Sequence, residues 1–325
     1  MTSFETIRLI HTVLNLYYIE KMKQAEIAEC LSLSLAKVNR LLQQAVDLGY
    51  IEFVIRTPFQ NLFTLEERLK AIFGLQEAIV VPEIGGTSNL LLNSIGTAAA
   101  TFLLEHLRDG DTLAITPGTT VQAVVRSIEA ARPYNVVVVP ILGSVQGEIE
   151  SDMNYLATQM GERLGGKAYQ LHAPAFADTQ EAAEMLRSME PVKKILEIGR
   201  NATVALLGIG TVDPQASRFV QFTALSAEEM KNIAEGCGGV GEISAHVYNI
   251  DGQPCAKDYA DRVIGLSLKE IHKIPYRIGV AGSAAKALPI YGALKGGYLH
   301  ALITDETAAL GVLEIFDGKF HNHKN

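Results

Sequence analysis

The sequence predicts an α/β protein in which an N-terminal winged helix-turn-helix unit precedes a doubly wound, mostly parallel α/β unit. Two patterns support this prediction. Beyond residue 77, short continuous apolar runs alternate with helical patterns, as in parallel sheets whose two faces are covered by helices. Before residue 57, three amphipathic helical patterns are followed by one run in which apolar and polar residues alternate. The chain of 325 residues is long enough for two such units.

Composition places the chain among globular proteins. Hydrophobic residues make up 48% of it, yet no apolar run approaches the roughly 20 residues that a membrane-spanning helix needs. The first residues, MTSFETIRLIH, lack the charged and apolar segments of a signal peptide. We therefore expect a cytoplasmic protein with no membrane partner.

Cysteine and histidine show no metal-ligand spacing. Cys30, Cys237 and Cys255 are scattered, and lone cysteines of this kind fit a reduced cytoplasm, with structural or incidental roles. The eight histidines are scattered as well. We expect neither a metal site nor a cofactor.

The charge of the chain is divided unevenly. The net charge is −8, but residues 1–56 contain six basic and six acidic residues and are therefore neutral. The rest of the chain carries the whole negative charge. A small neutral unit can still present a basic face to DNA, and an acidic remainder would keep DNA on that face.

Residues 1–56 predict a winged helix-turn-helix. A short helix, a tight turn and a longer helix form this motif, and a strand behind them forms the wing. Ser34 is well suited to cap the longer helix, and Gly49 to end it. The predicted elements are helices over 6–22, 24–31 and 35–48, a turn at 32–34 and a strand over 50–56.

The longer helix is the expected DNA reader, because the second helix of this motif lies in the major groove. Lys37 is expected to contact a phosphate of the DNA backbone. Arg40 is either a DNA contact or a salt-bridge partner, since arginine pairs with guanine or phosphate. A three-helix module that binds another protein is the alternative. The residues expected to contact DNA are Ser34, Ala36, Lys37, Asn39, Arg40 and Gln43.

Residues 57–76 form the expected connection between the two units. Leu62, Leu65 and Leu69 fall on one face of an amphipathic helix over 62–73, which Gly74 ends. This linker helix could pack on a twin subunit or on the second unit. It could also be a surface helix on its own core.

Residues 77–325 form the expected second unit. The carboxyl ends of its strands open onto small or polar loops, and open parallel sheets bind ligands at that edge. The predicted strands are 78–81, 112–116, 136–141, 204–209, 276–281 and 300–303.

Some of these loops carry groups suited to an anion. Gly118 lets the backbone approach a ligand, and Thr119 and Thr120 offer hydroxyl and N–H groups at a helix N-terminus, which suits phosphate. Taken alone, this motif is also an ordinary turn and helix cap. Lys286 stands on the first turn of a later helix. It either contacts an anionic ligand or is a lysine exposed to solvent. Asp305 can cap the following helix or contact a ligand.

Two stretches resemble the SorC family of bacterial transcriptional regulators. One is AEIAECLSLSLAKVNRLLQQAVDLGYI, and the other begins GVGEISAHVYNIDGQPC and extends from Gly239 to Ala309. The resemblance spans nearly the whole chain. It implies a regulator that binds operator DNA, and whose second unit binds a sugar or sugar-phosphate effector and forms a dimer or tetramer. It also implies a second unit similar in fold to sugar-phosphate isomerases and deaminases.

The resemblance further implies where the effector lies. In this family the loop with Thr119 contacts the effector, often its phosphate. A carboxylate at Glu242 suits two neighbouring hydroxyl groups, although an exposed loop acid is the alternative. The expected effector-binding residues are Gly118, Thr119, Thr120, Gln146, Asp152, Asn154, Gly208, Gly210, Glu242, Lys286 and Asp305.

An enzyme is the alternative function: a sugar-phosphate isomerase or deaminase with a fused helix-turn-helix. Acid–base chemistry on a sugar needs a positioned base and a second proton carrier. Glu242 and Asp305, with His246 and His300, are the candidates, but nothing in their spacing brings them together. A fused DNA reader favours regulation, so we expect no catalytic residue.

Overall fold

The computed structural model describes residues 4–51, 59–83, 88–144, 152–213, 217 and 226–318. The chain forms two compact units, Met1–Pro58 and Phe59–Asn325. None of the helices in these described ranges is long and apolar enough to cross a membrane.

The first unit is a three-helix bundle of α1 (Phe4–Leu14), α2 (Gln24–Cys30) and α3 (Leu35–Asp47). The helix predicted over 6–22 continues beyond α1 as a π-helical turn, η1 (Asn15–Ile19), and ends three residues before the predicted position. This turn contains two tyrosines and an isoleucine, which are weaker helix formers than leucine or alanine. The buried residues of the bundle are Ile10, Val13, Ile27, Ala28, Val38, Leu41, Leu42 and Ala45.

The ends of α3 agree with the sequence. The Ser34 hydroxyl accepts a hydrogen bond from the Lys37 N–H at 3.2 Å, so Ser34 is the predicted cap. Gly49 follows the helix with a φ of 70°, a conformation that favours glycine. The wing predicted over 50–56 lies mostly outside the described residues; Tyr50 and Ile51 form a bend.

The second unit is built on a parallel sheet of seven strands in the order β1-β10-β9-β5-β2-β3-β4. Every strand predicted for this unit is present. The chain runs outward from β2 through β3 to β4, and then returns through β5, so the strand order reverses between β2 and β5. The strands are β1 (Glu77–Val81), β2 (Thr112–Ile115), β3 (Val137–Pro140), β4 (Lys167–Ala168), β5 (Val204–Gly208), β9 (Tyr276–Val280) and β10 (Ala301–Asp305).

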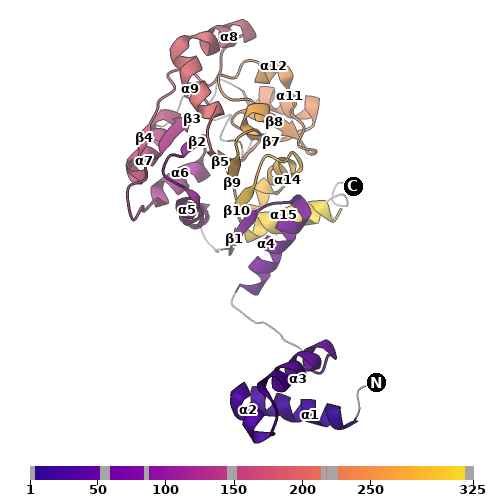
Figure 1. Cartoon of the computed structure of the whole chain (residues 1–325). Helices are drawn as coiled ribbons and strands as arrows, with labels where there is room; N and C mark the ends of the chain where they lie inside the picture. Colours follow the sequence, from indigo (N-terminus) through magenta and orange to yellow (C-terminus); the bar gives the residue numbers. More distant parts are fainter. Residues whose placement is uncertain are drawn as a thin grey trace. The chain divides into compact units, whose positions relative to one another are not determined.

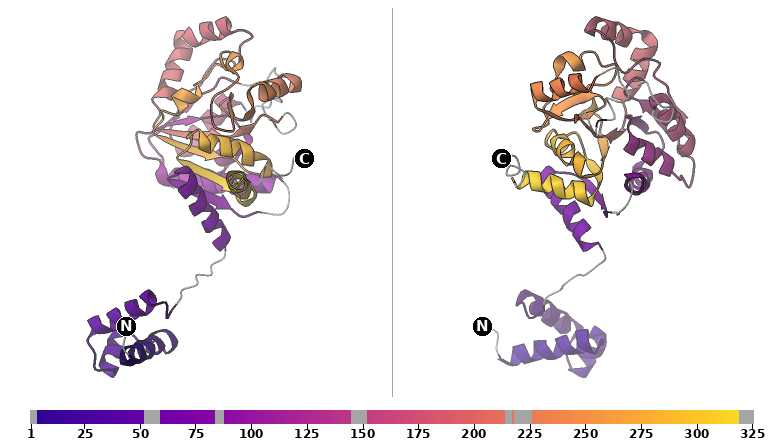
Figure 2. Two further views of the ribbon diagram at one scale, coloured as in Figure 1. Left: turned by 90° about the vertical axis from the view of Figure 1, so that its right-hand side faces the viewer. Right: turned by 180° about the vertical axis from the view of Figure 1, so that it is seen from behind.

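Helices cover both faces of this sheet (Figures 1 and 2). Two separate hydrophobic cores result, because successive residues of each strand point to opposite faces. One face carries α5 (Ser88–His106), α6 (Thr119–Ser127) and α7 (Met153–Leu164); the other carries α4 (Gln60–Phe73), α9 (Glu190–Arg200), α14 (Ala287–Lys295) and α15 (Glu306–Phe316).

The helix α4 belongs to the second unit. Leu62, Leu65 and Leu69 are buried in the core that also contains β1 and α15. The Val80 N–H donates a hydrogen bond to the Glu66 carboxylate at 2.8 Å, which fixes α4 on β1. Of the alternatives that the sequence left open for this helix, packing on the second unit is the one found within a single chain.

A second, antiparallel sheet stands beside the carboxyl ends of the parallel strands. It contains β6 (Gly210–Thr211), β7 (Gly239–Ile243) and β8 (His246–Asn249), and α11 (Ala227–Cys237) packs against it. This sheet was not among the predicted elements. The remaining helices are α8 (Gln180–Ser188), α12 (Lys257–Ala260), α13 (Leu268–Ile271) and the 3-10 turn η3 (Ala284–Lys286).

The small sheet also corrects the expectation of three lone cysteines. Cys237, at the end of α11, and Cys255, beside β8, form a disulfide with a Cα–Cα distance of 5.8 Å. They lie 18 positions apart in sequence, and the packing of α11 on the sheet brings them together. Cys30 is free and exposed.

Candidate functional site: a pocket at the carboxyl ends of the strands

The loop after β2 is held where β2 and β5 end. The Thr116 hydroxyl, which is buried, accepts a hydrogen bond from the Gly208 N–H at 2.8 Å and so ties the two strand ends together. Gly118 then turns the chain into α6 with a φ of 137°, which a side chain would resist. Thr119 and Thr120 form the first turn of α6. Their N–H groups belong to the helix end that attracts anions.

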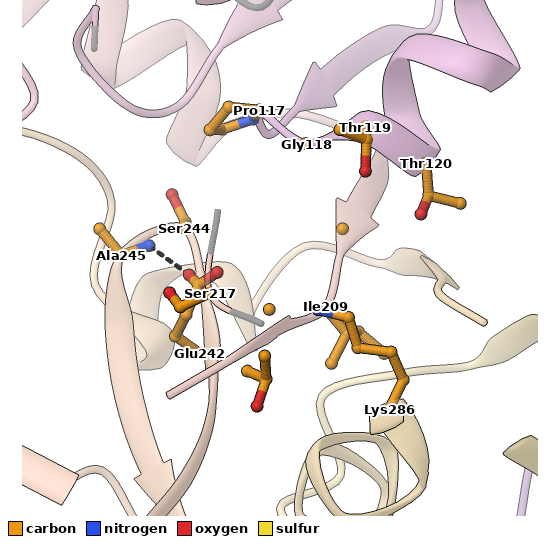
Figure 3. Close-up of a pocket in the computed structure, with 13 residues that line it drawn as sticks. Pro117, Gly118, Thr119, Thr120, Ile209, Ser217, Glu242, Ser244, Ala245 and Lys286 are labelled. Carbon is orange, nitrogen blue, oxygen red and sulfur yellow. Dashed lines mark hydrogen bonds between the residues drawn. The ribbon is translucent and has the colours of Figure 1, made fainter. Parts of the chain in front are cut away.

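Lys286 reaches the same place from another direction. It is the last residue of η3, directly before α14, and its side chain extends into the pocket in Figure 3. No described residue forms an ion pair with it. Burial holds the pKa of the Lys286 ammonium below its ordinary value, and the opposing charge of Glu242 only partly offsets that effect. A partly buried cation of this kind is ready to pair with an anionic ligand.

Glu242 comes from the antiparallel sheet. It lies in β7 opposite Gly210 of β6, where a Cβ atom would overlap its carboxylate. One carboxylate oxygen accepts a hydrogen bond from the Ala245 N–H at 2.9 Å (Figure 3). Burial raises the pKa of Glu242, against the lowering effects of that hydrogen bond and of Lys286.

These groups converge on one pocket of about 80 Å³. Typical ligand sites enclose roughly 300–1,000 Å³, so a sugar phosphate would extend beyond this rim or displace the walls. The pocket lies where the strand order reverses, the usual ligand crevice of an open parallel sheet. The predicted residues that line it are Gly118, Thr119, Thr120, Gly208, Gly210, Glu242 and Lys286.

Other predicted residues lie outside this pocket. The Asn154 amide is engaged by Ser144 and by both backbone groups of Leu171, and Asp152 caps α7. The Asp305 carboxylate accepts hydrogen bonds from the Ser283 N–H at 2.6 Å and from the Thr307 N–H at 3.2 Å. Asp305 therefore joins the loops after β9 and β10. Gln146 lies outside the described residues.

The two histidines considered for catalysis are not in the pocket. His300 precedes β10, at the opposite end of the sheet, and its Nδ1 accepts a hydrogen bond from the Arg277 N–H at 3.2 Å. His246 is buried, and its Nδ1 lies 2.8 Å from the Ser244 carbonyl oxygen. Its ring lines a separate cavity of about 390 Å³ with Arg187 and Glu270. The pocket thus lacks a histidine partner for Glu242 among the described residues.

Sequence reasoning missed six residues of the pocket wall: Pro117, Ile209, Thr211, Ser217, Ser244 and Ala245. Ser244 and Ala245 form the turn between β7 and β8, and both have a positive φ, of 52° and 67°. Two-residue turns of this kind usually contain Asn or Gly, and the Ser-Ala pair contains neither, so the sequence does not indicate a turn here. Only the pairing of β7 with β8 reveals it.

The first unit leaves its expected reading surface open. All six residues expected to contact DNA are exposed, and they lie on α3 or directly before it. The Gln43 amide donates a hydrogen bond to Asp47 at 3.0 Å, one turn further along. Arg40 forms no ion pair with any described residue, so its charge is available.

Known proteins resemble this chain over most of its length. A family model described as "Putative sugar-binding domain" matches residues 57–314. The erythritol catabolism regulatory protein EryD of Brucella abortus is 30% identical over 94% of this chain and 96% of its own. The deoxyribonucleoside regulator of Bacillus subtilis is 29% identical over 90% of this chain and 93% of its own.

A solved structure extends the likeness to the fold. The crystal structure of the full-length sorbitol operon regulator SorC from Klebsiella pneumoniae superposes with a TM-score of 0.74 at 26% identity. The match covers 95% of this chain and 99% of that one.

A helical N-terminal unit that exposes the polar side chains of α3, joined to an α/β unit with a polar pocket at its strand ends, defines a ligand-binding transcriptional regulator. The chain belongs to the SorC/DeoR family of sugar-binding transcriptional regulators. Its relatives are regulators and not enzymes, so the enzyme alternative is set aside.

Proposed function

We propose that the protein regulates a carbohydrate-utilisation operon, and that a sugar or sugar-phosphate effector bound in the second unit controls its affinity for operator DNA. Three relatives are named for erythritol catabolism, for deoxyribonucleosides and for a sorbitol operon. Each of these compounds is a polyol or contains a sugar. A ligand of that chemical class suits this pocket.

The observation that carries the proposal is the convergence of Thr119, Lys286 and Glu242 on one pocket. The first turn of α6 and the Lys286 ammonium suit an anionic group such as phosphate. The Glu242 carboxylate suits hydroxyl groups, because a carboxylate is an acceptor with two oxygens. A molecule with an anionic end and a hydroxylated end fits both.

The first unit is proposed as the winged helix-turn-helix that binds the operator. Its α3 would lie in the major groove, with Asn39 and Arg40 at base edges and Lys37 at a phosphate. Proteins of this class place two readers on two half-sites, so we propose a dimer or a tetramer assembled through the second unit. Residues 59–318, which include α4, would form that effector-binding and oligomerisation unit.

Thermal stabilisation of the full-length protein by a panel of pentoses, hexoses, polyols and their phosphates tests the ligand class. A ligand at 100 times its Kd adds about 2.7 kcal/mol to the free energy of unfolding, which raises the Tm measurably. Stabilisation by phosphates alone would support the anion site at Thr119 and Lys286. A panel with no stabilising compound would contradict the proposal.

A second measurement tests control of DNA binding. Effector binding should change the operator affinity by a coupling free energy of about 1–3 kcal/mol, or roughly 5- to 150-fold. The operator is first selected from a random DNA pool with the ligand-free protein. If saturating ligand left both operator affinity and oligomeric state unchanged, the pocket would not be a regulatory site.

A further inference from the structure

The turn between β7 and β8 has an unfavourable backbone and lies in the pocket wall. Ser244 and Ala245 both adopt left-handed conformations, with φ values of 52° and 67°. Residues with side chains seldom adopt this conformation, and the two-residue hairpin that needs it at both positions usually contains Asn-Gly. Such conformations persist where the surrounding structure imposes them, and they gather at ligand sites.

Two neighbours impose this conformation. The Glu242 carboxylate accepts a hydrogen bond from the Ala245 N–H at 2.9 Å on the pocket side. On the other side, the His246 ring lies 2.8 Å from the Ser244 carbonyl oxygen through its Nδ1. The turn is therefore held from both sides, and it presents Ser244 to the pocket.

The Ser244 hydroxyl is buried without a partner. Its residue is 3% exposed, and its oxygen makes no hydrogen bond with any described residue. Ser217 is 1% exposed, and its hydroxyl oxygen likewise makes no hydrogen bond with any described residue. Buried hydroxyl groups are nearly always hydrogen-bonded, and an unpaired one destabilises the fold. Two of them in one pocket wall indicate a partner that arrives with the ligand.

Figure 3 shows how these hydroxyl groups are distributed. Ser217 and Ser244 lie with Glu242 on one side of the pocket, and Thr119 and Thr120 lie on the other. The groups that suit an anion, which are Lys286 and the first turn of α6, are thus separated from a cluster of two serine hydroxyls and one carboxylate. That cluster suits neutral hydroxyl groups of a ligand, which can both donate and accept hydrogen bonds.

We propose that the Ser244 and Ser217 hydroxyls determine ligand specificity by binding hydroxyl groups at the end of the ligand remote from its anionic group. The inference rests on the proposed function of this pocket. The ligand hydroxyls donate to Glu242 and exchange hydrogen bonds with the two serines. A ligand without hydroxyl groups at that end leaves these buried groups unpaired and is rejected.

The substitution Ser244→Ala tests the inference without changing the turn, because alanine and serine meet the same backbone restriction. Removing an unpaired buried hydroxyl should raise the Tm of the ligand-free protein by roughly 1–4 °C. A residue that serves only the structure would lower the Tm when it is truncated. Thr304→Val is the matched control, because Thr304 is also buried and unpaired but lies in β10, outside the pocket.

Ligand affinity is measured by calorimetry with ribose 5-phosphate, erythritol 4-phosphate and sorbitol 6-phosphate, and with inorganic phosphate as the probe that has no carbon-bound hydroxyl. Ser244→Ala should weaken the binding of whichever sugar phosphates bind the wild-type protein by roughly 3- to 30-fold. It should leave the affinity for inorganic phosphate unchanged. Thr304→Val should raise the Tm as Ser244→Ala does, but it should change neither the affinity for sugar phosphates nor the affinity for inorganic phosphate.

Two results would overturn the inference and leave the proposed function intact. One is unchanged sugar-phosphate affinity in both Ser244→Ala and Ser217→Ala. The other is a lowered Tm with an equal loss for sugar phosphate and inorganic phosphate, which would make Ser244 a structural residue of the turn. If no sugar phosphate bound the wild-type protein, the proposed function itself would fail, and the inference with it.

Discussion

The Glu242 carboxylate and the Ala245 N–H are joined by a hydrogen bond of 2.9 Å. Ala245 adopts a left-handed conformation that its side chain disfavours, and this bond helps to hold it there. The same carboxylate faces Gly210 and the pocket. A ligand that engages Glu242 therefore acts on the turn as well.

Gly210→Ala should disturb both the fold and the pocket. A Cβ atom at this position would overlap the Glu242 carboxylate, which must then move away from Ala245. We expect a loss of about 1–3 kcal/mol in the free energy of unfolding and weaker ligand binding, measured by denaturant titration and calorimetry. Gly236→Ala is the control, because nothing lies within 4 Å of the new Cβ on α11. That substitution should stabilise by about 0.5–1 kcal/mol.

Ala245→Gly should stabilise the ligand-free protein. The left-handed backbone costs alanine about 1–2 kcal/mol, whereas glycine loses about 0.5–1 kcal/mol more conformational entropy on folding. The expected net gain is about 0.5–1 kcal/mol in denaturant unfolding. In Ala234→Gly, within α11, the same exchange should instead destabilise. Equal destabilisation in the two variants would show that the turn does not strain Ala245.

Lys286→Met should separate stability from binding. Burial lowers the pKa of Lys286, so the ammonium destabilises the fold in full at any pH below that lowered pKa. This cost declines as the pH rises from the lowered pKa towards the ordinary one and is absent above it. At neutral pH the variant should therefore gain in Tm by the part of this cost that the attraction between Lys286 and Glu242 does not offset. It should lose most of its affinity for phosphorylated ligands and keep its affinity for neutral ones. Lys295→Met, at the exposed end of α14, should do neither. Equal losses for phosphorylated and neutral ligands would contradict the assignment of Lys286 to the anion.

The binding of a phosphorylated ligand should weaken at alkaline pH. An anion near Lys286 raises the pKa of the ammonium, so binding is linked to retention of a proton. Affinity should therefore fall as the pH rises through the lowered pKa of the ligand-free protein. Calorimetry across the alkaline range measures this slope. Lys286→Arg should flatten it, because a guanidinium stays charged. A wild-type profile as flat as that of the variant would place the ligand's charge elsewhere.

Arg40→Ala should weaken operator binding and leave ligand binding unchanged. Loss of an arginine contact to a base or phosphate costs about 1–3 kcal/mol, and loss of a phosphate contact also lowers the salt dependence of log K by about one. Fluorescence anisotropy at several salt concentrations measures both effects. Lys231→Ala removes one positive charge from α11 in the second unit and serves as the control. If the two variants bound the operator equally well, Arg40 would not be part of the reader.

Local patterns in the sequence predicted the parallel sheet well. A buried strand such as β5 is a continuous apolar run, and its end is marked by Gly208, so neighbouring residues alone identify it. Ser34 and Asp305 were predicted as helix caps and are caps, because capping depends on residues two or three positions away.

The candidate site was less predictable because it depends on distant pairings. The strand patterns do not show that β6 pairs with β7, and that pairing alone brings Glu242 to Gly210. Asn154 has the polar character of a ligand contact, yet its amide is engaged by Leu171, seventeen residues away. The disulfide between Cys237 and Cys255 likewise depends on how α11 packs.

The burial of α4 sets a practical limit on where the second unit can be cut. A fragment that begins at residue 77 would lose Leu62, Leu65 and Leu69 and expose the apolar surfaces of β1 and α15 that they cover. Exposed patches of that kind promote aggregation. A fragment that begins at residue 59 keeps this surface covered. Recombinant production of the ligand-binding unit should therefore succeed from residue 59 and fail from residue 77.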